Sequence, residues 1–457
     1  MRSQSLLALC AGASAAAAAG FTADINIKTC DASGCTPAKK RVALDATSNH
    51  TSSAGASLIS VGGANLDALT LTYGGADVGG PRVYLIEEGG VDKNFMFALK
   101  NAEFTFDVEL SAMPCGFNAA LYFVGMQPNE GGAEAGTGYC DAQAVGGTFC
   151  SEMDVLEANT GAQQFTTHAC VDACASHTDN VTKCKGTGSP ATVCDQNGCG
   201  LNPFRYGPGT TYNTETNNGG WYGAGKTLDS GSRFTVVTQF RTAGGSAAGQ
   251  LSNITRFYVQ NGRHIELPAL FVLPPSDGSH MGGFAQPQIN DGYCTDIYDR
   301  WDAEQDKPLA QMGKNMENGM VLAMSAWYAQ ETYVDGKPVG GSQTGMSWLD
   351  GVNQWGKYVK AGPCNTTTTD AAGPYHATFS DIRIGAIGTT VPPPAPTPAP
   401  APTPPTPAPP TPPTPAPLAP GKCCYNGCGS GNCVETGFCG TDKTNCEGNC
   451  NGSWCPK

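Results

Sequence analysis

The sequence has few histidines, no cluster of basic residues, and no apolar run beyond its first twenty residues that is long enough to cross a bilayer. Asp and Glu number 39 against 26 Lys and Arg, which gives a formal net charge of −13. Such a surface does not attract phosphate backbones or anionic lipid. We therefore expect no nucleic-acid partner and no membrane partner, and a neutral polymer is the more natural ligand.

Cysteine is abundant, but its spacing is not that of a metal site. Between Cys140 and Cys199 no Cys-x2-Cys pair occurs, and histidine is scarce, so we expect structural disulfides and no zinc. Cys10 lies in the N-terminal apolar segment, which leaves twelve cysteines from Cys30 to Cys364 and eight from Cys423 to Cys455. Each even set can pair internally in an oxidising compartment, although the sequence does not fix the pairing.

Composition divides the chain into four parts. Residues 1–20 are typical of a secretory signal, with Arg2 before an apolar run and small residues at its end. Residues 391–421 are a Pro/Thr/Ala-rich linker, because 17 of the 33 prolines fall in 392–420 and exclude helix and central strand. The linker separates a large domain, 21–390, from a cysteine-rich module, 422–457. We expect a secreted protein, extracellular or in a cell wall, with candidate glycan sites at Asn49, Asn180, Asn253, Asn365 and Asn451.

The large domain shows short β-branched and aromatic stretches bounded by Gly, Asn, Asp and Pro, and little helical periodicity. We expect an all-β sandwich with long loops, in which the 60 glycines of the chain serve turns and close backbone approaches. The clearest predicted strands are 103–108, 119–124, 233–240, 255–260, 319–325 and 377–384.

The C-terminal module has eight cysteines and almost no apolar residue beyond Tyr425, Val434, Phe438 and Trp454. At this size a disulfide scaffold is the only plausible fold, so its aromatics are displayed more than buried. Displayed aromatics on a tether suit polysaccharide binding, which would raise the local enzyme concentration at a surface. A protease-resistant tail and a protein-binding knot remain alternatives.

Three acids, Glu152, Asp154 and Glu157, alternate with apolar residues as in a half-buried strand. In a regular strand Glu152 and Asp154 share a face, whereas Glu157 has the opposite parity. A bulge between Asp154 and Glu157 would bring Glu157 to the same face. Three carboxyl groups on one face repel, so at least one keeps its proton near neutral pH. The pattern suits a glycosidase that retains configuration, with carboxyl groups about 5 to 5.5 Å apart, or simply a solvated acidic strand edge.

The residues around these acids resemble the active-site strand of the family 7 glycoside hydrolases, which are cellobiohydrolases and endoglucanases. The matching strand is Cys-Ser-Glu-Met-Asp-Val-Leu-Glu-Ala-Asn at 150–159. Further segments resemble the same family in the same order, over about 25 to 390. They are 114–123, 138–143, 167–170, 199–204, 235–240, 319–322 and 347–350.

This resemblance implies a concanavalin-like β-jelly roll of two antiparallel sheets, with long disulfide-linked loops and a substrate cleft on the concave face. It assigns Glu152 as nucleophile, Glu157 as acid/base and Asp154 as the hydrogen-bond partner that holds and tunes Glu152. It places His168 near the leaving-group side and implies no metal and no organic cofactor. We expect a monomer that acts on cellulose or a related β-glucan.

The same resemblance supplies candidate substrate-binding residues. Trp327 and Trp348 match sugar-stacking tryptophans, since an aromatic face suits the C–H face of glucose. Polar cleft positions are matched by Arg82, Asn118, Tyr122, Tyr139, Asp141 and Gln143. For the tryptophans a core position, and for the polar residues and His168 a structural network, is the competing interpretation.

Departures from the family pattern favour an open cleft and internal cutting. The entrance, 44–50, lacks the usual tryptophans, Cys140 and Cys150 are only ten positions apart where the family has a long loop, and Leu156 stands where tunnel enzymes tend to carry Trp. We therefore predict a secreted endo-β-1,4-glucanase (cellulase). A cellobiohydrolase or a β-1,3/1,4-glucanase on the same fold is the alternative, and a wall lectin without catalysis is a weaker one. The disulfides implied by resemblance are 30–35, 115–364, 140–150, 170–194, 174–184 and 199–294.

Overall fold

The structure is a computed structural model, in which contacts between Cα atoms divide the chain into two compact units, Met1–Ala395 and Pro396–Lys457. The predicted signal, the prolines of the linker and Cys364 lie outside the described residues. In the first unit these are 21–47, 55–74, 79–89, 92–128, 132–178, 181–185, 193–203, 221–268, 270–272, 283–285, 287–298, 308–328, 332–334, 337–339, 346, 348–350, 362–363 and 374–391. In the second they are 421–424, 428, 433–434, 443, 446–447 and 453–456.

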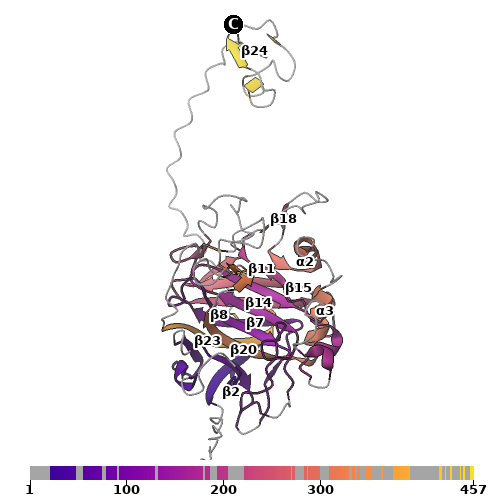
Figure 1. The fold of residues 1–457 in the computed structure, drawn as a ribbon. Coiled ribbons are helices and arrows are strands. Elements are labelled where there is room, and N and C mark those ends of the chain that lie inside the picture. Colours follow the sequence, from indigo (N-terminus) through magenta and orange to yellow (C-terminus); the bar gives the residue numbers. More distant parts are fainter. Residues whose placement is uncertain are drawn as a thin grey trace, which may run out of the picture. The chain divides into compact units, whose positions relative to one another are not determined.

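The first unit contains two antiparallel series of strands, which we call sheet I and sheet II (Figure 1). Sheet I carries the acidic segment near one end, and β6 (Met96–Phe97) also pairs with its strand β20 (Met320–Tyr328). Its strands lie side by side in the order β1 (Thr22–Asp31), β2 (Gly34–Leu44), β5 (Arg82–Ile86), β20 (Met320–Tyr328), β8 (Phe117–Val124), β9 (Glu152–Ala158), β10 (Gln163–His168) and β11 (Cys199–Leu201).

Sheet II is also antiparallel, and β19 (Gln288–Ile289) pairs with its strand β15 (Leu251–Gln260). Its order is β3 (Ile59–Gly62), β4 (Ala68–Tyr73), β23 (Tyr375–Ala386), β7 (Ala102–Glu109), β14 (Phe234–Thr242), β15 (Leu251–Gln260) and β16 (Arg263–Glu266). A short parallel pairing of β1 with β23 joins the two sheets along one border. The predicted sandwich of two antiparallel sheets is therefore confirmed, and this pairing makes its strands continuous.

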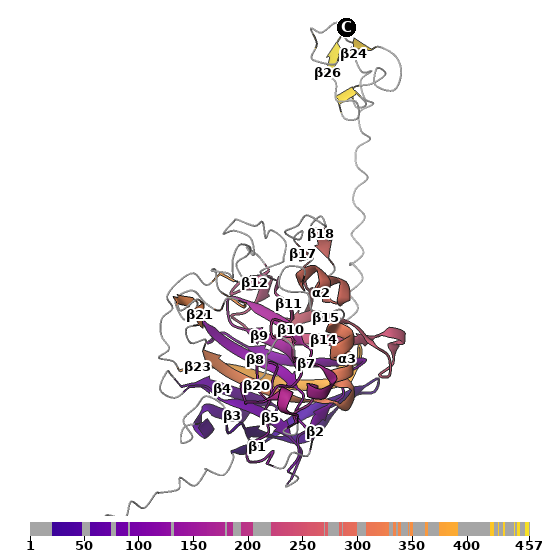
Figure 2. The same ribbon diagram turned by 45° about the vertical axis from the view of Figure 1, so that its right-hand side comes forward.

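Helices are few and short among the described residues, and none is long and apolar enough to span a membrane. The helix α3 (Pro308–Asn315) packs against β15 and β10 (Figure 2). The other described helix is α2 (Asp291–Tyr298), and the 3-10 turns are η1 (Gly55–Leu58), η2 (Asp172–Cys174), η3 (Thr182–Cys184), η5 (Ala243–Gly245) and η6 (Met316–Asn318). Three further strand pairs are β12 (Tyr222–Gly223) with β13 (Leu228–Asp229), β17 (Leu270–Val272) with β18 (Gly283–Ala285), and β21 (Thr332–Val334) with β22 (Lys337–Val339).

The core lies between the two sheets because alternate residues of each strand are large and apolar. On β8, Phe117, Leu121 and Phe123 belong to this core, whereas Tyr122 and Val124 pack in a separate cluster on the other face of sheet I. The ring of Phe123 meets that of Phe104 on β7 edge to face, with centroids 4.9 Å apart. Each such fully buried side chain contributes about 1.5–3 kcal/mol to stability. The other face of sheet I carries this second cluster together with the polar residues of the site.

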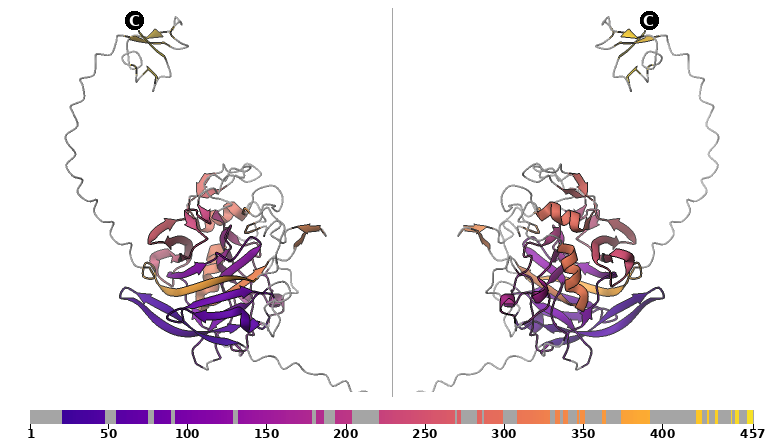
Figure 3. Two further views of the ribbon diagram at one scale, coloured as in Figure 1. Left: turned by 90° about the vertical axis from the view of Figure 1, so that its left-hand side faces the viewer. Right: turned by 90° about the vertical axis from the view of Figure 1, so that its right-hand side faces the viewer.

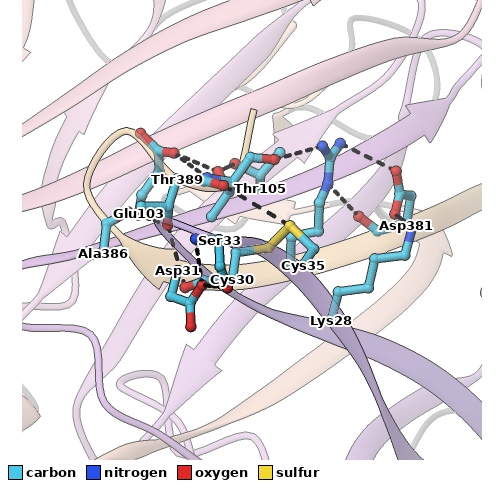
Figure 4. Close-up of a disulfide and its surroundings, with 12 residues drawn as sticks. Lys28, Cys30, Asp31, Ser33, Cys35, Glu103, Thr105, Asp381, Ala386 and Thr389 are labelled. Carbon is cyan, nitrogen blue, oxygen red and sulfur yellow. Dashed lines mark hydrogen bonds and ion pairs between the residues drawn. A yellow bond between two sulfur atoms is a disulfide. The ribbon is translucent and has the colours of Figure 1, made fainter. Parts of the chain in front are cut away.

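The border where the sheets join is tied by polar contacts (Figure 4). The disulfide Cys30–Cys35 closes the β1–β2 hairpin, the indigo ribbon in Figure 3. Lys28 forms an ion pair with Asp381 at 2.5 Å. The buried Glu103 carboxylate accepts hydrogen bonds from the backbone N–H groups of Gly388 and Thr390, at 3.0 Å each. These contacts fix the end of β23 and the adjoining residues 388–390 against β7.

All six predicted strands are present, as β7, β8, β14, β15, β20 and β23. Five of the disulfides implied by resemblance also form, namely 30–35, 140–150, 170–194, 174–184 and 199–294. Cys115 is disulfide-bonded, and the sixth pairing cannot be assessed because Cys364 lies outside the described residues.

The C-terminal unit is a small disulfide-bonded scaffold by itself. Its three strands, β24 (Gly421–Cys424), β25 (Cys433–Val434) and β26 (Ser453–Pro456), form one antiparallel sheet with β24 in the middle. Disulfides join Cys423 with Cys446, Cys424 with Cys433, and Cys428 with Cys455. The predicted disulfide scaffold is therefore confirmed for the described part of this unit.

Candidate active site

Strand β9 carries a β-bulge at the position that the parity of its acids requires. Opposite β8, Leu121 pairs with Leu156 and Tyr122 with Asp154, so Val155 is passed over. The register with β10 shifts in the same interval. Because of this extra residue, Val155 and Leu156 both pack in the core between the sheets. The predicted bulge is confirmed, and it brings Glu157 to the face that carries Glu152 and Asp154.

Glu152 lies almost buried, with 8% of its surface exposed. Its Oε2 accepts a hydrogen bond of 3.1 Å from the backbone N–H of Ala142, in the loop between Cys140 and Cys150. Burial and the charges of Asp154 and Asp141 raise the pKa of Glu152 well above its usual range, against the opposing effects of His168 and the Ala142 N–H.

Asp154 forms an ion pair with His168 on the neighbouring strand β10, where its Oδ2 lies 3.0 Å from Nε2. The other ring nitrogen, Nδ1, lies 2.7 Å from the carbonyl oxygen of Asp195. Both nitrogens therefore donate to acceptors, which favours the imidazolium. Although burial disfavours that charge, Asp154 raises the pKa of His168 to about 10. His168 thus carries a positive charge beside the acids at neutral pH.

The ring of His168 packs against Gly198, where there is no room for a larger side chain. A Cβ at this position would lie 2.4 Å from Cε1 of His168, and the backbone φ of Gly198 is +68°. The N–H of Gly198 also donates to Oδ1 of Asp195 at 2.9 Å, which forms a turn that aims the Asp195 carbonyl at the ring. Only glycine meets both requirements without strain.

Glu157 is held by two donors at one oxygen. The Nδ2 of Asn118 lies 2.8 Å from its Oε1, and the indole Nε1 of Trp348 lies 3.3 Å from the same atom. Burial, together with the charge of Asp154, raises the pKa of Glu157 to about 7. Since the pKa values of Glu152 and Glu157 are both raised, the site holds at least one carboxyl proton near neutral pH. This is the condition that the sequence predicted.

The register of sheet I lines up a row of residues across the strands on this face. Arg82 on β5 lies opposite Ser325 on β20, which lies opposite Ala120 on β8, which lies opposite Glu157 on β9. Strands are about 4.8 Å apart, so Arg82 is about 14 Å from Glu157 along the row. The two residues between them on this row, Ser325 and Ala120, have small side chains.

Arg82 belongs to a polar cluster at the far end of this row. Its Nε donates to Oδ2 of the buried Asp45 at 2.5 Å, and its guanidinium lies 3.4 Å from the ring centroid of Tyr139. The hydroxyls of Tyr139 and Tyr122 are 2.9 Å apart. The predicted residues Arg82, Tyr122 and Tyr139 therefore come together in one network that holds a charged group at the surface of sheet I.

The predicted residues Asp141 and Gln143 lie in the short loop beside Glu152. The buried Oδ1 of Asp141 accepts hydrogen bonds from the N–H groups of Gln143 and Val145, at 3.0 and 2.9 Å. Burial raises the pKa of Asp141 despite these bonds. Gln143 is exposed and donates to the carbonyl of Gln196 at 2.8 Å, which links this loop to the one beside His168. These bonds hold the backbone of the loop around Asp141, and the substrate-binding role of Asp141 stays a prediction.

Trp327 and Trp348 stack with their ring centroids 6.1 Å apart, and both are partly exposed. Trp327 lies opposite Asn118 in the register of β20 and β8, on the side of Glu157. The Trp348 segment is anchored by the buried Asp350, whose Oδ2 accepts from Asn159 at 2.6 Å and from the N–H of Gly116 at 2.8 Å. The two tryptophans thus form a platform next to Glu157.

Two disulfides bracket the hydrogen bonds of the site. Cys140–Cys150 closes the loop that contains Ala142, and Glu152 follows Cys150 by two residues. Cys170–Cys194 begins two residues after His168 and ends immediately before Asp195. By lowering the entropy of the unfolded chain, closure of loops of 10 and 24 positions stabilises the folded state by about 2.7 and about 3.4 kcal/mol.

The structure also contains groups that the sequence did not single out. They are the N–H of Ala142, the carbonyl of Asp195 and Gly198. The segment Asp195-Gln196-Asn197-Gly198 carries a turn signal, Asn-Gly, that could have indicated the last two. Within the part of the chain that is described, no group of three or more His, Cys, Asp or Glu side chains is arranged to hold a metal ion.

Comparison with known proteins gives consistent matches. The family model described as glycosyl hydrolase family 7 matches residues 57–146 and 144–391. The endo-beta-1,4-glucanase celB of Aspergillus oryzae is 36% identical over 340 residues, which cover 68% of this chain and 70% of that protein. A family 7 cellobiohydrolase from Daphnia pulex superimposes with a TM-score of 0.62 and 27% identity, covering 82% of this chain and 99% of the other. An endoglucanase I solved in complex with cellobiose gives a TM-score of 0.59 and 27% identity over 80% and 97% of the chains.

Proposed function

The chain belongs to glycosyl hydrolase family 7 and hydrolyses internal β-1,4-glucosidic bonds of cellulose, and from this premise we propose that Glu152 and Glu157 are its nucleophile and its acid/base. The bulge in β9 carries this proposal, because it brings the two carboxyl groups to one face of sheet I. Retaining hydrolysis requires such a pair on either side of the scissile bond.

In the first step, the protonated Glu157 gives its proton to the glycosidic oxygen while the Glu152 carboxylate attacks the anomeric carbon. The bond to the leaving sugar breaks and an α-linked glycosyl-enzyme forms. In the second step, Glu157 takes a proton from water, the water oxygen attacks the anomeric carbon, and Glu152 leaves as a carboxylate. The product keeps the β configuration.

His168 and Asp154 act in opposite directions on the ionisation of Glu152, because the charge of Asp154 raises its pKa and that of His168 lowers it. The raised pKa of Glu157 supplies the proton for the first step, and the imidazolium of His168 favours ionised Glu152. Among the described contacts, the ion pair of Asp154 is to His168. We propose that Asp154 tunes Glu152 through its charge and through its ion pair with His168, and the direct hydrogen bond to Glu152 that the resemblance implied stays a prediction.

The row across sheet I supports a cleft for an extended glucan. Trp327 and Trp348 offer stacking faces next to Glu157, Asn118 and Tyr122 lie on the same face, and Arg82 with Tyr139 lies at the far end. Asp141 and Gln143 would shape the loop beside Glu152. The ligand would be cellulose or a related β-glucan.

We propose the same organisation for the whole chain as the composition indicated. Residues 1–20 would be a signal that directs secretion, 21–390 the hydrolase domain, 391–421 the linker, and 422–457 a carbohydrate-binding module. The protein would act as a monomer outside the cell or in its wall. The disulfides of both units suit an oxidising destination.

Internal cutting and linkage preference can be tested together. Digestion of soluble carboxymethylcellulose should lower viscosity rapidly while few reducing ends appear, because one internal cut halves a chain. Viscosity and reducing ends are followed in parallel on carboxymethylcellulose and on laminarin, a β-1,3-glucan. Cleavage of laminarin alone would assign the enzyme to the β-1,3 class. Reducing ends without a viscosity drop would assign it to exo-acting cellobiohydrolases.

The pH dependence of kcat/KM should fall on its alkaline side with an apparent pKa near 7, since Glu157 must be protonated to act. The charge of His168 lowers the pKa of Glu157. His168→Asn removes that charge, so the alkaline limb should move to higher pH. The exposed His264 on β16 gives a control, His264→Asn, that should leave the limb in place. A limb that moves to lower pH in His168→Asn contradicts the assignment.

A further inference from the structure

On its core side the bulge in β9 makes a polar contact that involves none of the proposed catalytic or substrate-binding residues. Val155 is the residue passed over in the register with β8, so it lacks a paired residue there. Its carbonyl oxygen accepts a hydrogen bond from the guanidinium Nη2 of Arg256, which lies on β15 in sheet II. The contact therefore crosses the interior of the sandwich, from one sheet to the other.

Arg256 reaches the bulge from among core residues. Its neighbours in alternation on β15, Ile254 and Tyr258, belong to the core between the sheets, and only 3% of Arg256 is exposed. Packed sheets lie about 10 Å apart, so only a long side chain can span the gap. Arginine can do so while it keeps several donors at its tip.

The guanidinium is fixed in place at its base and over its face. Its Nε and Nη2 donate to Oγ1 of Thr238, on the paired strand β14, at 3.2 and 3.0 Å. Its Cζ lies 4.0 Å from the ring centroid of Phe165, which packs beside the bulge on β10. Next to it, the hydroxyl of Tyr258 donates to Oε1 of Gln163 at 2.7 Å. Sheet II thus holds β9 and β10 by polar contacts through the core.

A buried charge in this position is costly, since burial lowers the pKa of Arg256 and no carboxylate in the described part of the chain pairs with it. An apolar residue of similar length would remove this cost. It would also leave the Val155 carbonyl buried at a broken ladder without its donor. The arginine is therefore best explained by what it does for the bulge.

We propose that Arg256 is a positioning residue that holds the bulge of β9, and with it the acid/base Glu157, in catalytic register. Without the contact, β9 can relax toward a regular strand, and a regular strand turns Glu157 away from Glu152 by parity. The nucleophile Glu152 precedes the bulge and keeps its pairing with Val124 and His168. The loss should therefore fall on proton donation more than on nucleophilic attack. This inference rests on the proposed role of Glu157.

The test compares two substrates that differ in their need for an acid. Cellotetraose has a poor leaving group that must be protonated, whereas 2,4-dinitrophenyl β-cellobioside releases a stable anion without help. Arg256→Met should lower kcat/KM about 100-fold on cellotetraose and by less than about 10-fold on the activated glycoside. Arg256→Lys, which keeps one donor, should recover about 10-fold of the loss on cellotetraose. Arg241→Met, at an exposed position of β14, is the matched control and should behave as wild type.

Equal losses on the two substrates, or no loss, would overturn the proposal, because a general weakening of the fold does not distinguish leaving groups. Thermal unfolding of each variant sets an assay temperature at which all are folded. If Arg256→Met does not fold, Thr238→Val decides, since it removes only the anchor of Arg256 and should show the same preference in smaller measure. Glu157→Gln distinguishes failure of this inference from failure of the proposed function. If Glu157→Gln loses activity equally on the two substrates, the acid/base assignment of Glu157 fails. If Glu157→Gln loses activity selectively on cellotetraose but Arg256→Met does not, only the role of Arg256 fails.

Discussion

Glu157→Gln is expected to lower kcat/KM on cello-oligosaccharides by roughly 100- to 10,000-fold, the usual contribution of a general acid, and to lower glycosyl-enzyme formation from 2,4-dinitrophenyl β-cellobioside by far less. The amide cannot protonate a leaving sugar, but its Oε1 can still accept from Asn118 and Trp348, so the site keeps its geometry. Steady-state and burst kinetics on the two substrates measure the difference.

Azide provides the complementary measurement for this variant. Release of the glycosyl-enzyme also needs Glu157, as a base, so the intermediate should accumulate in Glu157→Gln. Azide needs no base and should accelerate turnover and give β-cellobiosyl azide. An α-linked azide, or no acceleration together with equal losses on both substrates, would rule Glu157 out as the acid/base.

The same variant should change stability with a definite sign. Burial raises the pKa of Glu157 from its ordinary value to about 7, so the folded state prefers the protonated form. Protonated Glu157 therefore stabilises the folded state in acid, and this stabilisation is lost as the pH rises through about 7. Glu157→Gln should therefore be more stable than wild type in alkaline buffer, by up to about 3 kcal/mol, and similar to it near pH 4.

Glu152→Ala is expected to lose hydrolysis on the order of 10⁴-fold or more, since the covalent route disappears. The vacated space faces the anomeric carbon, where the glycosyl-enzyme would carry its α-linked ester. An α-cellobiosyl fluoride donor resembles that ester and should occupy this space. With Glu157 intact as the base, an acceptor sugar can displace fluoride and form a β-1,4 bond that the variant no longer hydrolyses. Mass spectrometry of the growing oligomers measures the reaction.

Glu152→Gln is the matched control for this synthesis. It removes the nucleophile but fills the same space, so it should neither hydrolyse cello-oligosaccharides nor extend the fluoride donor. Hydrolysis above about 1% of wild type in both variants would show that another carboxylate attacks, with Asp154 the nearest in sequence. If Glu152→Ala binds cellobiose as wild type does but forms no oligomers from the fluoride donor, the retaining mechanism is contradicted.

The sequence predicted those features of the site that depend on residues close together in the chain. The alternation of acids with apolar residues in 152–157 predicted a strand, and the parity of Glu157 predicted a bulge, because the period of a strand is two residues. Both are present. The six clearest strands were also predicted from local composition, and the resemblance supplied the five disulfide pairings that the residues alone left open.

The partners of these residues were not predictable, because they depend on the register between distant segments. Arg256 lies 101 positions from Val155, in a segment whose pattern predicts only a strand. The N–H of Ala142 and the carbonyl of Asp195 are backbone groups, which leave no trace in residue type. The charge of His168 results from its two acceptors. The sequence therefore predicted the chemistry of the side chains, and the fold supplied their pKa values and orientation.

The disulfides beside the catalytic strand bear on when in the life of the protein activity begins. Ala142 lies two residues after Cys140, and Asp195 directly follows Cys194, so each backbone partner of the site is tethered by a crosslink. A newly made chain in a reducing cytosol already carries every catalytic side chain, but the loops that orient Glu152 and His168 are still open. For the secreted enzyme that we propose, competence for hydrolysis would be acquired only when these disulfides form on the export route, so the enzyme would be inactive inside the cell that makes it.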